Sequence, residues 1–298
     1  MSIFSSRPLV LLLLMLCAAL VLDRAAVRLG EAALRHSGFR YARLYFGTAG
    51  TDVAIFGNSR AVHAFHAPTL SQALCRPVEN LAYNGLDMAG VAALAQDTVA
   101  RDPGLKVAVI EVTALFSAGR TTAQLAPFAR QSPRLSALIQ ADAPGILPWR
   151  HVLGSLALNS EMFWRALLYL GESDQGWINH KGPPPVAVLD AYRARPPRQM
   201  IADPAALAQL RGLIAALEAA GVQPVLTVAP YHPVIRTRAE PSDWLAQLSE
   251  NLHFPILDLG VGIQQDALFA DPLHGNLDGA IAVARALVPE LGRCGTGS

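Results

Sequence analysis

The chain has 298 residues, with 24 Lys and Arg against 23 Asp and Glu, so its formal net charge is +1. Because nucleic-acid-binding domains carry a basic stripe or patch, this balance predicts no nucleic-acid partner. Hydrophobic residues make up 52% of the chain. That fraction is enough for the core of one large domain, or of one domain with an insertion.

The amino-terminal segment predicts a connection with a membrane. An uncharged run extends from Pro8 to Leu22, between Arg7 and Asp23. A spanning helix needs about 20 apolar residues and a signal-peptide core about 7–15, so the length alone favours an export signal. No small-x-small cleavage pattern directly follows the run, which favours an uncleaved anchor. We therefore expect residues 1–23 to be a signal-anchor or a signal peptide.

Residues 24–50 then predict a connector helix between the membrane and the domain. Arg7 and the amino terminus would stay in the cytoplasm, since positive charge favours that side of the membrane. The expected localisation is therefore the cytoplasmic membrane, with the remaining chain on its periplasmic or other extracytoplasmic side.

The rest of the chain predicts an α/β fold. Short apolar segments alternate with helical patterns, which is typical of a parallel sheet built from βαβ units. In such sheets, sites form beyond the carboxyl ends of the strands. The five predicted strands are 52–57, 77–82, 106–112, 224–229 and 254–258, and the helices between and after them are 60–74, 87–102, 204–220, 241–251 and 277–291.

Residues 117–200 interrupt this alternation. They contain helix-like stretches near 121–141 and 151–170, followed by a proline-rich piece. We expect this block to form a helical insertion over the rim of the sheet. Its aromatic residues, which include Phe163, Trp164 and Tyr169, predict core packing within the insertion, with a lid or a sugar platform as the alternative.

Ser59 comes directly after the first predicted strand. The strand-to-helix turn would place its hydroxyl at the rim and its amide at the start of a helix, which suits a nucleophile whose own N–H helps to hold an oxyanion. A serine in this place is also a common helix cap.

Asp271 and His274 lie shortly before the last predicted helix, separated by a proline-containing turn. A carboxylate in this position can bind the imidazole Nδ1–H, which leaves the other ring nitrogen free to take a proton from a serine. Taken separately, the two residues also fit a capping aspartate and a surface histidine.

Together these segments resemble the sequence blocks of the SGNH (GDSL-type) hydrolases. The family's first block is Gly-Asp-Ser, here Gly57-Asn58-Ser59, and its last block is Asp-x-x-His, here Asp271 to His274. The glycine of its second block corresponds to Gly85. The resemblance covers roughly 52–116 and 202–291.

That resemblance implies a flavodoxin-like three-layer α/β/α fold with a parallel five-stranded sheet, occupying 51–298 with the insertion at about 117–200. It implies a triad of Ser59, His274 and Asp271, with the amides of Ser59 and Gly85 holding the oxyanion, and no cofactor or metal.

One family element is missing. The third block carries an Asn after the third strand as a side-chain oxyanion donor, whereas here that strand leads into Glu111-Val-Thr113. Loss of such a donor costs about 3 kcal/mol of transition-state stabilisation, and Thr113 is the candidate replacement. A missing Asn, an anchor and a large insertion resemble the envelope branch of alginate-acetylation and D-alanylation factors.

The resemblance implies an envelope-facing serine-dependent acyl (O-acetyl) transferase or esterase. Its substrate would be a cell-surface polysaccharide or a related acyl ester, with a membrane acyl-transfer protein as a further partner. The alternative is a catalytically weak binding or assembly component of a polysaccharide-modification system.

Four other side chains are candidates for ligand binding at the same rim. Arg60 and His232 are candidate substrate-binding residues, with a solvated arginine and a loop histidine without a role as the alternatives. His63 and His66 are three apart on a helix, but no third ligand lies near in the sequence, so we expect no metal.

The last prediction concerns Cys75 and Cys294. In a flavodoxin-like fold, the first and last helices lie side by side and run parallel, so their carboxyl ends are neighbours. We therefore expect a disulfide between these two cysteines, provided that their Cα atoms lie within about 7 Å.

Overall fold

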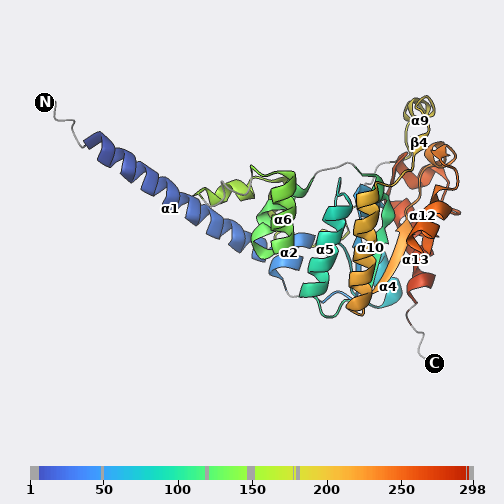
Figure 1. The fold of residues 1–298 in the computed structure, drawn as a ribbon, viewed down its shortest axis with the longest axis horizontal. Helices are drawn as coiled ribbons and strands as arrows, with labels where there is room; N and C mark the ends of the chain where they lie inside the picture. The colour runs from blue at the N-terminus through green and yellow to red at the C-terminus, as the bar shows by residue number, and fades with distance from the viewer. Residues whose placement is uncertain are drawn as a thin grey trace. The chain divides into compact units, whose positions relative to one another are not determined.

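The computed structural model in Figure 1 describes residues 7–47, 50–117, 121–145, 152–176, 178, 182–292 and 294. The chain forms two compact units. Unit 1 consists of Met1–Gly47 and Thr122–Glu172, and unit 2 consists of Thr48–Thr121 and Ser173–Ser298.

Unit 1 is helical in its described residues. Its elements are α1 (Arg7–Arg35), α2 (Arg40–Phe46), α6 (Pro133–Asp142) and α8 (Glu161–Leu168), with 3₁₀ segments η2 (Thr122–Gln131) and η3 (Gly154–Leu158). Serine side chains begin α6 and α8: Ser132 accepts a bond from the Leu135 amide and Ser160 one from the Phe163 amide, which satisfies donors that a helix start leaves free.

Helix α1 has two halves with different surroundings. Every residue from Arg7 to Leu22 is exposed, whereas Asp23, Val27, Gly30 and Leu34 are buried. The spacing of three and four residues places these four on one face of the helix. Among the described residues, α1 is the one helix that is long and apolar enough to cross a membrane, a test that a signal sequence also passes.

The predicted boundary at Asp23 is not a break in the structure, because α1 continues through it to Arg35. The Asp23 carboxylate accepts bonds from the amides of Gly154 and Ser155, each at 2.9 Å, and from the Ser155 hydroxyl at 2.6 Å. A carboxylate with these partners is accommodated inside unit 1, so its charge does not end the helix.

Unit 2 is built on a five-stranded parallel sheet with the order β2-β1-β3-β5-β7. All five predicted strands are present, and the α/β class is confirmed. All carboxyl ends lie at one edge, and the strand order reverses beside β1, which is where sites form in such sheets. The strands are β1 (Val53–Phe56), β2 (Val78–Asn80), β3 (Val107–Glu111), β5 (Gln223–Val228) and β7 (Ile256–Asp258).

Alternating residues of the sheet form the core with three helices. Val53, Ile55, Val107, Val109 and Val225 are buried in one cluster, as expected for side chains that share one face of a sheet. The helices that complete this cluster are α3 (Ser59–Ala64), α4 (Ala67–Leu74) and α13 (Leu277–Leu291). Two further helices, α5 (Met88–Arg101) and α10 (Pro204–Ala219), pack against each other.

Two predicted helices differ from the structure. The helix predicted at 60–74 is divided into α3 and α4, because the backbone of Phe65 and His66 is extended and Pro68 begins the second helix, a position that favours proline. The stretch predicted at 121–141 is divided in the same way by Ser132 and Pro133.

Small elements near the carboxyl edge complete unit 2. Residues 182–200, which were predicted as part of the insertion, belong to this unit and contain α9 (Val186–Arg193) and β4 (Arg198–Gln199). The remaining elements are η1 (Val112–Phe116), α11 (Pro233–Arg236), β6 (Ala239–Glu240), α12 (Trp244–Leu252), η4 (Asp266–Leu268), β8 (Phe269–Asp271) and β9 (His274–Gly275).

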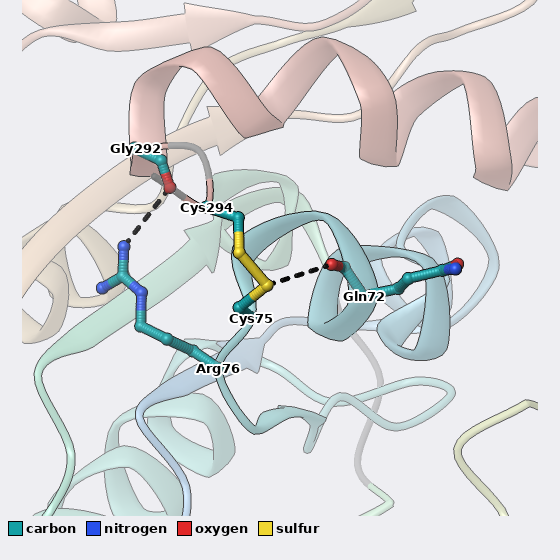
Figure 2. The surroundings of a disulfide bond; sticks show 5 residues. All are labelled: Gln72, Cys75, Arg76, Gly292 and Cys294. Atoms are coloured by element: carbon teal, nitrogen blue, oxygen red, sulfur yellow. Dashed lines mark hydrogen bonds between the residues drawn. A yellow bond between two sulfur atoms is a disulfide. The ribbon is translucent and has the colours of Figure 1, made fainter. Parts of the chain in front are cut away.

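The Cys75–Cys294 disulfide is confirmed, with a Cα–Cα distance of 5.4 Å. Figure 2 shows that it joins the end of α4 to the segment after α13. The Arg76 guanidinium donates to the Leu291 carbonyl at 2.6 Å, and the Cys294 amide donates to the Ala73 carbonyl at 3.2 Å. The two cysteines are separated by 219 positions in the chain, and the loop that the bond closes contains β2, β3, β5 and β7.

We expect removal of this bond to destabilise unit 2. Closing a long loop restricts the unfolded chain, and a native disulfide contributes about 2–5 kcal/mol. The variant Cys75→Ser/Cys294→Ser should therefore have a lower unfolding free energy in urea. Cys17→Ser is the matched control, because Cys17 is unpaired and exposed. Equal stability of the double variant and the control would contradict the prediction.

Candidate active site

Ser59 is the first residue of α3 and follows β1 by two residues. The turn requires Gly57, whose φ is +155° and at which a Cβ would lie 2.7 Å from the Ala61 Cβ. Asn58 caps the helix by accepting a bond from the Arg60 amide at 2.9 Å. The Ser59 amide belongs to the first turn, whose N–H groups have no partner within the helix.

Asp271 and His274 are paired across a tight hairpin formed by β8 and β9, which we call the histidine hairpin. They belong to the antiparallel strands β8 and β9, and only Pro272 and Leu273 lie between them. The Asp271 Oδ1 atom accepts bonds from the amides of Leu273 at 2.8 Å and His274 at 3.1 Å. These two bonds fix the carboxylate on the turn, in the direction of the imidazole.

The three side chains form a continuous hydrogen-bonded line. His274 Nδ1 lies 2.9 Å from Asp271 Oδ2, and His274 Nε2 lies 2.8 Å from Ser59 Oγ. With the Nδ1 proton donated to the carboxylate, Nε2 is the acceptor for the serine hydroxyl. Ser59 and His274 are both partly exposed, so a substrate can reach the reacting atoms.

The charge of Asp271 is stabilised in this arrangement. Partial burial favours its neutral form, but the hydrogen bond and charge of His274, with the amides of Leu273 and His274, hold the pKa of Asp271 below its ordinary value. Asp271 is therefore ionised at neutral pH and can stabilise an imidazolium that forms beside it.

Gly85 lies on a turn that continues the pairing of β1 with β2. The Leu81 amide donates to the Ile55 carbonyl at 2.8 Å, and the Tyr83 amide donates to the Gly57 carbonyl at 3.2 Å. Because of these bonds, the segment after β2 lies beside the segment that leads from β1 to Ser59. Gly85 then has a φ of +74°, and a Cβ there would lie 2.7 Å from Thr121 Cγ2, so both conformation and space require glycine.

Arg60 connects the serine helix with the histidine hairpin from inside the protein. Its guanidinium donates to the Leu273 carbonyl at 2.8 Å and to the Ala229 carbonyl. It lies 3.6 Å from Glu111 Oε1 and 3.3 Å from the centre of the Tyr231 ring. The cation of Arg60, which follows β1, thus contacts the last residue of β3, the segment after β5 and the residue before His274.

Glu111 is the partner that makes this burial possible. Its side chain is fully buried, and it accepts bonds from the Thr113 amide, the Thr113 hydroxyl and the Ala229 amide. Burial raises the pKa of Glu111, and the Arg60 charge and the hydrogen-bond donors oppose that rise. We treat the pair as ionised, because every neighbouring group donates to the carboxylate.

The structure gives Arg60 and His232 partners other than a substrate. Arg60 is 4% exposed and His232 is 3% exposed. His232 Nδ1 accepts a bond from the Val234 amide at 3.1 Å, and its Nε2 lies 3.0 Å from Asp266. Its backbone amide also donates to the Pro272 carbonyl at 3.2 Å. Both residues therefore support the histidine hairpin, which differs from the predicted contact with substrate.

Three other predicted candidates also have defined partners. The Thr113 hydroxyl donates to Glu111 at 2.5 Å and is buried, so it is not directed at an oxyanion. The His63 ring packs 5.1 Å from the His274 ring, and His66 Nδ1 lies 2.7 Å from the Thr69 hydroxyl. Among the described residues, no group of three or more His, Cys, Asp or Glu side chains is placed to hold a metal ion.

Glu111 is the functional-site residue that the sequence reasoning missed. It ends the apolar strand Val107–Glu111, all of whose residues are buried. A lone carboxylate in a buried strand needs a cationic or hydrogen-bonding partner. The sequence therefore signals that Glu111 has such a partner, but it does not identify Arg60 as that partner.

Comparison with models of known protein families found no match, and comparison with curated proteins found no similar sequence.

We expect Arg60 and Glu111 to be energetically coupled. Arg60→Met leaves a buried carboxylate without its cation and should lower the unfolding free energy by about 3–5 kcal/mol. Arg60→Met/Glu111→Gln removes both charges and should recover part of that loss. Urea unfolding of the wild type, both single variants and the double variant gives the coupling. Additive effects would contradict the pairing.

Proposed function

We propose that this chain is a serine-dependent acyl transferase or esterase of the SGNH (GDSL-type) kind that acts outside the cytoplasmic membrane. The observation that carries the proposal is the line of hydrogen bonds from Ser59 through His274 to Asp271, at 2.8 and 2.9 Å. Such a line is the arrangement by which a base activates a serine. The parallel sheet order supports a flavodoxin-like three-layer fold for this domain.

The first half of the reaction forms an acyl-enzyme. Ser59 Oγ attacks the acyl carbonyl carbon while its proton passes to His274 Nε2. The Ser59 and Gly85 amides hold the negative oxygen of the tetrahedral intermediate. The bond to the leaving alcohol then breaks, and that alcohol takes the proton from His274.

In the second half, water or an acceptor hydroxyl attacks the acyl carbon and gives its proton to His274. The Ser59–acyl bond breaks, and the proton returns to Ser59. Attack by water gives hydrolysis, and attack by a sugar hydroxyl gives transfer. We propose a cell-surface polysaccharide as the acceptor and a membrane acyl-transfer protein as the source of the acyl group.

Two features support the location. Helix α1 has the length and composition of a membrane-spanning segment, and the structure contains a disulfide, which is typical of oxidising compartments. We propose that α1 anchors the chain and that unit 2 lies on the periplasmic or other extracytoplasmic side.

One observation favours the alternative of a catalytically weak binding or assembly component. The Asn of the family's third block is absent, and the Thr113 hydroxyl, the candidate replacement, is bonded to Glu111.

The chain has another carboxamide near the proposed oxyanion site, that of Asn84. It is exposed and lies beside Gly85 on the turn closed by the bond from the Leu86 amide to the Tyr83 carbonyl. We place the missing side-chain donor there.

The test of the enzyme is covalent labelling with a fluorophosphonate probe, followed by mass spectrometry. The wild type should be labelled on Ser59, and Ser59→Ala should not be labelled, because the nucleophile is lost. Asp271→Asn should be labelled far more slowly, since the imidazole loses its orienting carboxylate. Labelling that persists in Ser59→Ala would reject the assignment. A wild type that neither labels nor cleaves acetyl esters, but still binds glycan, would support the alternative.

Asn84→Ala should slow turnover of a small acyl ester by about 10²–10³-fold, the usual effect of losing one oxyanion donor. The value of kcat should fall more than KM rises, since the donor acts on the transition state. Ser117→Ala is the control for removal of a polar side chain after β3. An unchanged kcat in Asn84→Ala would show that the donor lies elsewhere.

A further inference from the structure

A hollow of about 230 Å³ in unit 2 is lined by three arginines. Arg195, Arg198 and Arg238 surround it, Tyr192 adds an aromatic ring, and Val234 and Ile235 of α11 add aliphatic side chains. These residues come from the segments around α9, β4, α11 and β6. Figure 1 shows α9 and β4 close together within this unit.

The positive charge of this hollow has no acidic counterpart. Among the described residues, no carboxylate lies within 4.0 Å of the guanidinium groups of the three arginines. The two acids nearest in sequence are engaged elsewhere: Asp190 pairs with Arg193 at 2.5 Å, and Glu240 accepts a bond from Gln199 at 2.9 Å. Three like charges around one space repel each other, and an anion between them removes that cost.

Backbone carbonyls hold the Arg238 guanidinium, whereas those of Arg195 and Arg198 contact aromatic rings. Arg238 donates to the carbonyls of Tyr192, Arg193 and Arg195, at 3.0, 2.7 and 2.6 Å, so it serves the carboxyl end of α9 as well as contributing charge. Arg195 lies over the Tyr192 ring at 4.1 Å, and Arg198 lies 5.6 Å from the Tyr231 ring centre. Within the described part of the chain, the Arg195 and Arg198 side chains donate no hydrogen bond, and the Arg198 Nε atom is buried without a partner. The donors of Arg195, which is exposed, are accessible to a ligand.

The hollow is connected with the histidine hairpin by shared packing. Tyr231, Val234 and Ile235 belong to one buried cluster, against which Leu273, the residue before His274, also packs. The Tyr231 ring contacts Arg198 on the hollow and Arg60 beside Ser59. The hollow is therefore separate from the Ser59–His274 site, but the two share packing contacts through Tyr231 and Leu273.

We propose that this hollow binds the oxyanion of an acidic sugar unit, either a carboxylate or a phosphate. Guanidinium groups match both oxyanions with paired hydrogen bonds, while Tyr192 and the aliphatic floor offer an apolar surface to the sugar ring. The identity of this ligand as part of the acceptor rests on the proposed function. The site itself requires no activity of Ser59.

The test is calorimetric titration of the full chain, carrying Ser59→Ala, at low ionic strength. Glucuronic acid and glucose 6-phosphate distinguish the carboxylate from the phosphate, and glucose is the uncharged comparison. We expect saturable binding of at least one acid and none of glucose. Arg195→Gln/Arg198→Gln should weaken that binding about tenfold or more, because charge-assisted hydrogen bonds are lost. Arg238 is left intact, since it also supports α9.

Arg285→Gln is the matched control, because it removes one exposed positive charge from α13 of the same unit. It should leave the affinity unchanged. Binding that is absent in all proteins, or that is unaffected by Arg195→Gln/Arg198→Gln, would overturn the proposal. Since these measurements use an inactive serine variant, they fail or succeed independently of the labelling of Ser59.

Discussion

The buried cation of Arg60 is the constraint on which the geometry of the site depends. An arginine side chain that is 4% exposed is costly to desolvate unless its charge is paired and its N–H groups have acceptors. Glu111 provides the charge, and the Leu273 and Ala229 carbonyls provide acceptors. These partners come from the ends of β3 and β5 and from the hairpin of Asp271 and His274, which are distant from one another in the chain. Correct pairing of the cation therefore requires that these segments meet at one edge of the sheet.

The same requirement gives Ser59 and His274 their relative position. Arg60 follows Ser59, and Leu273 precedes His274, so the bond between the Arg60 guanidinium and the Leu273 carbonyl joins the same two segments as the bond between Ser59 Oγ and His274 Nε2. His232 adds a second support through the bond from its amide to the Pro272 carbonyl. The partly exposed bond between Ser59 and His274 is thus supported by the bonds of Arg60 and His232, which are buried. Such supporting bonds hold the side chains of a site in a fixed geometry.

Much of this arrangement could be predicted because its signals are local. The strand ending at Phe56, the glycine turn at Gly57 and the Asp-x-x-His spacing each depend on a few neighbouring residues, and a parallel sheet brings strand ends together. The Cys75–Cys294 bond followed from the expected order of helices. The roles of Arg60, His232 and Thr113 were harder to predict, because burial depends on which segment covers a residue. A sequence shows that Arg60 is charged, but it does not show that Glu111 lies opposite.

The helix boundaries that were mistaken have the same origin. Asp23 ends the apolar run but not the helix, because its carboxylate is satisfied by Gly154 and Ser155, more than 130 residues away in the chain. The break between α3 and α4 had a local signal in Pro68, but the apolar periodicity across 60–74 masked it. The segment 182–200 has no strong periodicity, so its place in unit 2 follows from packing in the cluster around Tyr231, Val234 and Ile235.

The arginine-lined hollow bears on the choice between hydrolysis and transfer. In the proposed mechanism, both reactions share the acyl-enzyme on Ser59, and they differ in the nucleophile that reaches the acyl carbon. Water is always present at a partly exposed serine, so transfer requires that an acceptor hydroxyl be held close to the acyl group for a large fraction of the time. A charged group of the acceptor, bound at Arg195 and Arg198, would provide that proximity through effective concentration. Because charges near the surface are screened by salt, the ratio of transfer to hydrolysis would then fall as ionic strength rises, whereas acylation of Ser59 would not.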